Sequence, residues 1–368
     1  MYPAFIDDVE VGHRIFIDDG NIELKVTGKT ANSLVCTVIN GGIVYTGKGI
    51  NLPDSIINSP SVTERDWKCV DWAIKNNLDY LAMSFVRTSD DIKLLRDYLD
   101  KANADIKIIA KIETPQSLKN LDDIIQASDA VLVARGDLGV ETSFAEVPLV
   151  QKKITHLGRL YGKPVIVATQ MLQSMIDSPS PTRAEVSDVA NAIMDYADAV
   201  MLSGETSVGK FPVQAVDTIC RIAAVTESFL DENRNINPKP VTVDVLAMTA
   251  AIARSVAQIV DDVKPKIVAV WSQTGSSARL LSKTRIDVPV IAFSSRQSLC
   301  RQMALHYGLI PFYQPTPENI RQFVSLVEKF ALEHNLANAG DMIIIIAGEP
   351  VVAAGTKNAL LAHTIVAH

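Results

Sequence analysis

The sequence is poor in the residues that build disulfide frameworks, histidine metal sites and membrane spans. Only four of its 368 residues are cysteine, none in a CxxC pair, and its six histidines form no HxH or HExxH pattern. These spacings argue against a disulfide scaffold and against a zinc site. The longest aliphatic run, 342–347, is far too short to cross a bilayer, and the amino end lacks a signal-peptide pattern. We therefore expect a cytoplasmic protein with no membrane partner.

Basic residues are also too few to favour a nucleic-acid partner. The 35 Lys and Arg residues are outnumbered by 42 Asp and Glu residues, so the net charge is −7. Binding a phosphate backbone requires a positive face, although a local cluster of cations could still bind a small anion. The 48% hydrophobic content is that of an ordinary globular chain, and the length predicts two or three domains.

Residues 1–53 contain short β-rich runs joined by turn residues. Strands are expected at 14–17, 22–26 and 34–38. Asp18, Asp19, Gly20 and Asn21 between the first two runs predict a hairpin, and we expect both aspartates to be solvated turn charges. Three strands are few for an independent domain, so this segment is interpreted as part of a small β domain.

Residues 54–230 alternate apolar runs of strand length with amphipathic helical stretches. Strands are expected at 78–85, 106–112, 130–134, 164–168 and 199–203. Thr114 before Pro115, and Thr182 with Glu185, mark helix starts. The alternation predicts a parallel α/β sheet. A polar linker at 231–240 precedes a third region, 241–368, in which a helix at 246–261 and strands at 266–271, 289–293 and 341–346 predict a doubly wound α/β domain.

Polar residues end nearly every strand of the middle region, in the strings SFVR, AKIE, ARGD, ATQ and SGET. In a parallel barrel the carboxyl ends of all strands lie on one face, where the ligand binds. Ordinary solvated loops would instead begin mainly with Gly, Pro and Asn. The pattern therefore favours an active rim.

The rim places a lysine and two carboxylates on neighbouring strands. Lys111 and Glu113 are two residues apart, so they share one face of a strand and must pair, titrate or hold a ligand; an interior salt bridge is the structural alternative. Asp137 follows the next strand, after Gly136, whose lack of a side chain lets an anion approach the backbone N–H groups. Two carboxylates suit Mg²⁺ or Mn²⁺, and Thr169 adds a hydroxyl on the following strand.

Such a site fits a small anion that carries both a phosphate and a carboxylate. Phosphoryl transfer is the favoured reaction. Metal-assisted enolate formation, as in lyases that act on pyruvate or other oxo acids, is the alternative chemistry. An inactive metabolite-binding or assembly subunit on the same scaffold is the alternative outside catalysis.

Several long motifs resemble pyruvate kinase closely, in order and at consistent spacing. They are IDDG (17–20), KGINLP (48–53), AKIE (110–113), VARGDLGVE (133–141), VPLVQKK (147–153), GKPVIVATQML (162–172), PTRAEVSDVANAI (181–193) and AVMLSGET (199–206). The resemblance implies a TIM-type (β/α)₈ barrel with a β lid domain and a C-terminal α/β domain. It also implies a homotetramer that transfers a phosphoryl group from phosphoenolpyruvate to ADP in glycolysis, giving pyruvate and ATP, with Mg²⁺ and K⁺.

The resemblance also assigns roles to individual residues. Lys111 and Thr169 match catalytic residues, with Lys111 stabilising the phosphoryl group in transit, and Glu113 and Asp137 match the metal ligands. The backbone amides of Gly136 and Asp137, together with Thr169, match the site of the substrate carboxylate. Three further residues are implied in binding, namely Lys48 at the nucleotide phosphates and Ser84 and Phe85 beside the substrate and potassium. The segment 271–277 lies where the family binds an effector phosphate, with a helix cap as the alternative.

The amino end departs from the family pattern. The strands and ligands that precede the lid in a pyruvate kinase do not occur, so we expect the chain to be truncated and to begin inside the lid domain. An incomplete barrel of five strands is then expected, with domains at 1–53, 54–230 and 241–368. A gene fragment, half of a split enzyme and an inactive relative are the three explanations. On any of them, the isolated chain is expected to have weak or absent kinase turnover.

Overall fold

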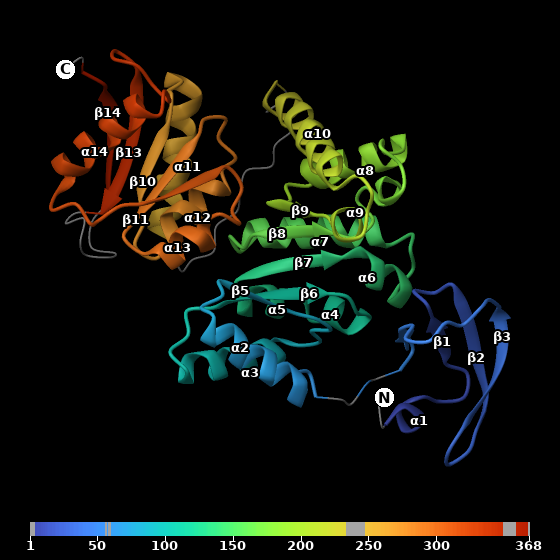
Figure 1. The fold of residues 1–368 in the computed structure, drawn as a ribbon. Helices are drawn as coiled ribbons and strands as arrows, with labels where there is room; N and C mark the ends of the chain where they lie inside the picture. Colours follow the sequence, from blue (N-terminus) through green and yellow to red (C-terminus); the bar gives the residue numbers. More distant parts are fainter. Residues whose placement is uncertain (1–3, 56, 58–59, 233–246, 349–357, 367–368) are drawn as a thin grey trace. The chain divides into compact units, whose positions relative to one another are not determined.

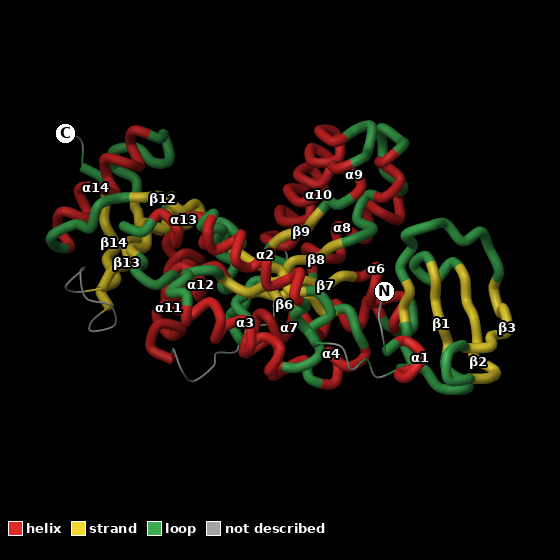
Figure 2. Tube along the Cα trace, turned by 60° about the horizontal axis from the view of Figure 1, so that its bottom comes forward, coloured by secondary structure: helices red, strands yellow, loops and turns green. Residues whose placement is uncertain are grey.

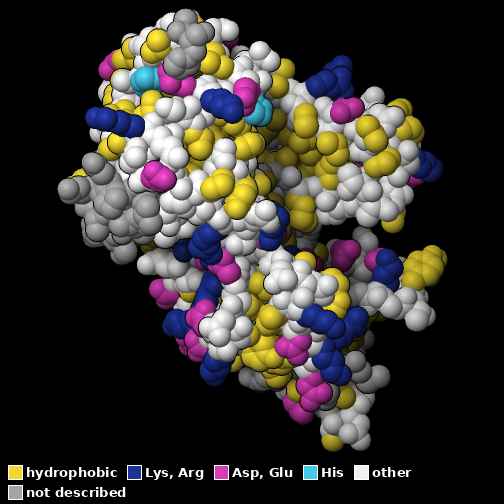
Figure 3. Space-filling view, turned by 60° about the vertical axis from the view of Figure 1, so that its left-hand side comes forward, with side chains coloured by type: hydrophobic (Ala, Val, Ile, Leu, Met, Phe, Trp, Pro, Cys, Tyr) yellow, Lys and Arg dark blue, Asp and Glu magenta, His cyan; other side chains and the backbone are white. Residues whose placement is uncertain are grey.

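The computed structural model describes residues 4–55, 57, 60–232, 247–348 and 358–366. Contacts divide the chain into two compact units. The first comprises residues 1–157, 165–195 and 200–223, and the second comprises 158–164, 196–199 and 224–368. Of the helices within the described ranges, none combines the length and apolar composition needed to cross a bilayer. Charged side chains of both signs are interspersed on the face drawn in Figure 3.

The first strands form a small antiparallel sheet. After a short helix α1 (Phe5–Asp8), the strands are β1 (Arg14–Ile17), β2 (Ile22–Lys29), β3 (Leu34–Asn40) and β4 (Ile50–Asn51), in the order β3-β2-β1-β4. Figure 2 shows β1, β2 and β3 side by side. Ile17 pairs with Ile22 across a turn in which Asp18, Asp19 and Gly20 all have positive φ, so the expected hairpin is confirmed. The two-residue strand β4 was not expected, because it is too short to show a periodicity.

A five-stranded sheet follows, with its strands in chain order. The strands are β5 (Tyr80–Met83), β6 (Lys107–Ile112), β7 (Ala130–Ala134), β8 (Val165–Ala168) and β9 (Ala199–Met201). The pairs β5–β6, β6–β7 and β7–β8 are parallel, and Figure 1 traces the order from one strand to the next. Each strand lies within a segment predicted to be a strand, and β7 and β8 are buried throughout. Consecutive parallel order is the arrangement of a (β/α) barrel.

Helices connect these strands and begin where the sequence marks a start. They are α2 (Glu64–Lys75), α3 (Ser89–Lys101), α4 (Pro115–Lys119), α5 (Leu121–Ala127), α6 (Arg135–Glu141), α7 (Val147–Leu160), the 3₁₀ turn η1 (Gln173–Ile176), α8 (Arg183–Met194), α9 (Gly204–Ser207) and α10 (Pro212–Glu232). Thr114 caps α4 ahead of Pro115, and Thr182 forms a capping box with Glu185 at α8, as expected. Each connection returns the chain to the edge of the sheet where the previous strand began. The carboxyl ends of the parallel strands from β5 to β8 therefore lie at one edge of the sheet.

The carboxyl-terminal part contains a second parallel sheet. Its elements are α11 (Ala247–Val263), β10 (Val268–Trp271), α12 (Ser276–Ser282), β11 (Val290–Ser294), α13 (Gln297–Met303), β12 (Leu309–Tyr313), α14 (Ile320–Glu333), β13 (Met342–Gly348) and β14 (Asn358–Thr364). The order is β12-β11-β10-β13-β14, and only β14 pairs antiparallel to its neighbour. Separate apolar clusters cover the two faces, so the expected doubly wound α/β domain is confirmed. The predicted linker 231–240 lies outside the described residues from residue 233 onward.

Candidate active site

Lys111 and Glu113 form an ion pair at the carboxyl end of β6. The Lys111 Nζ atom lies 2.5 Å from Glu113 Oε1 and donates a hydrogen bond to Ser84 Oγ at 2.8 Å, at the end of the adjacent strand β5. The Glu113 side chain is fully buried, whereas the Lys111 side chain is 23% exposed. The lysine is thus held in one orientation while its ammonium group remains reachable from solvent.

The buried carboxylate of Glu113 is only partly compensated. Its Oε2 atom accepts a 2.6 Å hydrogen bond from the Phe85 N–H, in a peptide turned into the left-handed region by a φ of +53° at Phe85. Beyond the Lys111 pair, Oε1 accepts no further hydrogen bond from the described residues. Burial raises the pKa of Glu113; Lys111 and Phe85 oppose this, and the charge of Asp137 adds to it. Lys111 balances only one of two carboxylates that repel each other, so the remaining negative charge favours a cation.

A divalent cation could be held by this pair. Among the described residues no three His, Cys, Asp or Glu side chains gather as a metal site. Mg²⁺ and Mn²⁺ do not need three, because they are commonly bound by one or two carboxylates and keep waters and substrate oxygens as other ligands. Glu113 and Asp137 follow the hydrogen-bonded neighbours β6 and β7, so the donor set fits such an ion.

Thr169 and Gly136 meet at the ends of β7 and β8. The Gly136 N–H donates to Thr169 Oγ1 at 2.8 Å, and the same hydroxyl donates to the Ala168 carbonyl oxygen at 2.6 Å. Thr169 has a φ of +69°, and Gln170 a φ of +53°. A β-branched residue in the left-handed region is a backbone outlier, and such outliers cluster at ligand sites. The structure therefore brings together the predicted pair Gly136 and Thr169, with the hydroxyl fixed by two hydrogen bonds.

Arg135 belongs to the same rim, although its place in the string ARGD predicted no role for its side chain. Its side chain is 8% exposed, and its Nη1 atom lies 2.7 Å from Asp188 Oδ1 on α8. Its Nη2 atom donates to the Thr169 carbonyl oxygen at 2.8 Å. The sequence signal for this role was an arginine directly after a strictly apolar strand. A guanidinium buried at that position needs several hydrogen-bond acceptors, so it predicts contacts with neighbouring loops.

Lys48 lies in the small antiparallel sheet region and has a different partner. Its Nζ atom is 2.6 Å from Asp18 Oδ1 in the hairpin turn. Hydrogen bonding to Lys48 lowers the pKa of Asp18. Asp18 is therefore a turn charge, as expected, and it is also paired, because a lysine 30 positions away folds back onto it; Asp19 is exposed. No described ion pair or hydrogen bond joins Lys48 to the rim residues.

The antiparallel sheet is nevertheless bonded to the rim elsewhere. Asn51 in β4 is buried, and its Nδ2 donates to Glu141 Oε1 at 2.8 Å. Glu141 ends α6, the helix that starts at Arg135 and contains Asp137. Burial raises the pKa of Glu141, with Asn51 opposing it and Asp137 adding to it.

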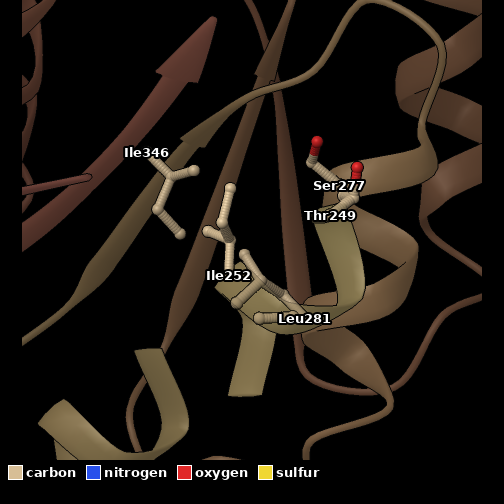
Figure 4. A pocket seen from close by; sticks show the side chains of 6 residues that line it. Thr249, Ile252, Ser277, Leu281 and Ile346 are labelled. Carbon is tan, nitrogen blue, oxygen red and sulfur yellow. The ribbon is translucent and has the colours of Figure 1, made fainter. Parts of the chain in front are cut away.

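The segment 271–277 forms a helix start in the second sheet region. Gly275 caps α12 with a φ of +85°, and its N–H donates to Ser272 Oγ at 3.1 Å. A small cavity lies next to it between α11, α12 and β13, and Figure 4 shows the side chains that face it. Its lining is Thr249, Ile252, Ala253, Ser277, Leu281 and Ile346. The local bonds are those of a helix cap.

Known proteins resemble the chain over nearly all of its length. Residues 1–216 match the family model described as pyruvate kinase, barrel domain, and residues 250–363 match pyruvate kinase, alpha/beta domain. A pyruvate kinase of Geobacillus stearothermophilus is 41% identical over 99% of this chain, and one of Mycobacterium intracellulare is 39% identical over 99%. A crystal structure of a pyruvate kinase from Cryptosporidium parvum superposes with a TM-score of 0.87 at 34% identity, covering 99% of this chain.

The relatives are longer than this chain. It spans 62% of the Geobacillus protein, 76% of the Mycobacterium protein and 74% of the Cryptosporidium chain. The matched residues include every strand from β1 to β13 and all of the rim residues described above. The two family models, the identity and the superposition agree with one another, and the chain belongs to the pyruvate kinase family.

Proposed function

We propose that the protein transfers a phosphoryl group from phosphoenolpyruvate to ADP, giving pyruvate and ATP. Two local arrangements at the ends of neighbouring strands support the proposal. Lys111 pairs with Glu113 beside the charge of Asp137, and the Thr169 hydroxyl is bonded to the Gly136 N–H. Family membership supports it independently.

Lys111 is proposed to stabilise the phosphoryl group in transit. Its ammonium group is oriented by Glu113 and Ser84 and is partly exposed, so it can approach the phosphoryl oxygens without leaving its partners. Phosphoryl transfer needs little covalent help from the protein, and fixed positive charge near the equatorial oxygens is the main contribution available.

The carboxylate end of the substrate is proposed to bind at Gly136, Asp137 and Thr169. The hydroxyl of Thr169 is already aligned with the Gly136 N–H. On binding, the carboxylate would replace the Ala168 carbonyl oxygen as acceptor of the hydroxyl hydrogen and Thr169 Oγ1 as acceptor of the Gly136 N–H, which holds the enol carbon in a fixed position relative to Lys111. Ser84 and Phe85 would line the remaining wall, consistent with the 51% exposure of Phe85.

Glu113 and Asp137 are proposed to hold Mg²⁺ or Mn²⁺. The repulsion between Glu113 and Asp137, of which Lys111 balances only one charge, supports this assignment. When bound, the ion supplies neutralisation of the negative charge on the phosphoryl oxygens. A potassium ion is expected in this family, but Ser84 is occupied by the Lys111 ammonium, and we derive no step through potassium.

Several broader assignments follow from the family and are also proposals. Lys48 would reach the nucleotide phosphates after leaving Asp18. The domains would be a β lid at 1–53, a barrel region at 54–230 and an α/β domain at 241–368. A homotetramer in the cytoplasm is the proposed state, which light scattering of the purified chain would test.

The proposal is tested by measuring ATP formation from phosphoenolpyruvate and ADP. Lys111→Met is expected to lower kcat by at least about 100-fold, because one preorganised charge near a transition state contributes on this scale. Lys107→Met is the matched control, since Lys107 begins the same strand and pairs with Asp105 at 2.8 Å, at the opposite end. Asp137→Asn should raise the Mg²⁺ concentration needed for half activity.

Three results would contradict the proposal. Lys111→Met with the activity of Lys107→Met would remove the lysine from the chemistry. Release of pyruvate from phosphoenolpyruvate without a nucleotide would mean transfer of the phosphoryl group to water, as in a phosphatase. Release of pyruvate from a larger oxo acid, with no need for phosphoenolpyruvate or a nucleotide, would replace kinase chemistry by that of a lyase.

A further inference from the structure

Arg135 binds the loop after β8 through several acceptors at once. Its Nη2 atom donates to the Thr169 carbonyl oxygen at 2.8 Å and to Met171 Sδ at 2.9 Å, while Gln170 O lies 3.4 Å away. Its Nη1 atom is held by Asp188 at 2.7 Å. A planar guanidinium can make these bonds together because its donors point in fixed directions, which an ammonium group cannot reproduce.

The bound loop has an unfavourable backbone conformation. Thr169 and Gln170 are consecutive residues other than glycine with positive φ, so the loop needs outside contacts to keep its shape. Arg135 supplies such contacts at Thr169. The buried carboxylate of Glu205 supplies one at the far end, accepting from the Leu172 N–H at 3.0 Å.

The position of the Thr169 hydroxyl depends on this loop. The hydroxyl accepts from the N–H of Gly136, the residue next to Arg135 in the chain. The Arg135 side chain therefore holds the backbone of Thr169, directly beside the Gly136 N–H that bonds the Thr169 hydroxyl. We propose that Arg135 is a positioning residue that sets the Thr169 hydroxyl for the carboxylate of phosphoenolpyruvate, an inference that rests on the proposed function.

A purely structural arginine is the alternative, and one on a helix that contacts the same sheet allows a comparison. Arg96 on α3 pairs with Asp129, which precedes β7, and donates to the Ile106 carbonyl oxygen at 3.3 Å, just before β6. It thus joins a carboxylate and a backbone carbonyl, as Arg135 does, but at the amino ends of the strands. Replacing Arg96 should lower stability without changing the rim.

The experiment compares Arg135→Met, Arg135→Lys and Arg96→Met in the full chain. Arg135→Met is expected to raise the KM for phosphoenolpyruvate by roughly tenfold or more, the scale of one misplaced hydrogen bond to a charged group, and to leave the KM for ADP unchanged. Arg135→Lys should show a smaller rise, because it keeps one donor and the charge. In a Thr169→Ala background, Arg135→Met should add little, since the hydroxyl it positions is gone.

Hydrogen exchange of the Gly136 amide gives a readout that does not require activity. Arg135→Met and Arg135→Lys should both speed exchange of this amide, and Arg96→Met should not. Unchanged exchange and unchanged KM for phosphoenolpyruvate in Arg135→Lys would overturn the positioning role. If the wild-type chain forms no ATP while the exchange result holds, the proposed function does not hold for the isolated chain, as the expected truncation predicts, and the positioning of Thr169 stands.

Discussion

Replacing Glu113 separates the part of the rim that supports the fold from the part that binds a ligand. Glu113→Gln keeps an oxygen for the Phe85 N–H and removes the negative charge. Weakening that hydrogen bond from a charged to a neutral one costs about 1 kcal/mol, and losing the pair with the partly exposed Lys111 costs up to about 1 kcal/mol. Burial and the charge of Asp137, which together raise the pKa of Glu113, act in the opposite direction.

These effects nearly cancel, so the free energy of unfolding of Glu113→Gln should stay within about 1 kcal/mol of the wild type at pH 7 without metal. Glu113→Leu should lose about 3 kcal/mol, because it leaves the Phe85 N–H without an acceptor and the Lys111 ammonium without its carboxylate, with only the Ser84 hydroxyl as partner. Adding Mg²⁺ at ten times its Kd should stabilise the wild type by about 1.4 kcal/mol and leave Glu113→Gln unchanged.

The assay is urea unfolding of the three proteins in EDTA and in Mg²⁺, repeated between pH 7 and pH 5. A raised pKa in the folded state means that the wild type gains stability relative to Glu113→Gln as the pH falls toward the ordinary value of 4.5, by up to about 1.4 kcal/mol per pH unit. If Glu113→Gln and Glu113→Leu have the same free energy of unfolding, the ionised carboxylate of Glu113 stabilises the fold. Its main role would then not be to bind a cation.

Two further predictions concern other parts of the chain. Asp18→Asn frees Lys48 from its ion pair and should lower the KM for ADP by no more than about fivefold, because exposed pairs contribute little, whereas Lys48→Met should raise it. Burial, with the charge of Lys283, lowers the pKa of His306 to about 3. Between about pH 6.5 and 3 the unfolded chain therefore takes up a proton at His306 that the folded chain does not. The free energy of unfolding decreases as the pH is lowered through this range, by up to about 1.4 kcal/mol per pH unit. Urea midpoints at pH 7 and pH 5 should differ less in His306→Gln; an equal difference would contradict the assignment.

The strands and their polar ends could be predicted because they depend on local pattern. Buried parallel strands are nearly continuous apolar runs, so β7 coincides with its predicted range. The two-residue spacing of Lys111 and Glu113 fixed their common face, and the structure pairs them. The strand β12 was missed because Pro311 interrupts its pattern, which an edge strand tolerates.

Long-range partners could not be predicted in the same way. The contact of Asp18 with Lys48 and the acceptors of Arg135 depend on how distant segments fold back, which no local pattern reports. The left-handed backbone conformation of Thr169 could not be predicted either. Threonine rarely adopts a positive φ, and here the surrounding hydrogen bonds stabilise it. The site residues were recognisable by type, and their mutual orientation was not.

The pairing of β6 with β7 has a consequence for how ligand affinity can be used. Lys111 stands opposite Leu132, and Ala134 opposite Ala168 on the next pair. A slip of one residue between these strands would send Lys111 and Glu113 to the opposite face of the sheet, while the apolar burial of the strands would change far less. Binding of substrate or metal would therefore report the register of these strands. It would distinguish the native sheet from a compact state with shifted strands, which circular dichroism alone would not separate from the native protein.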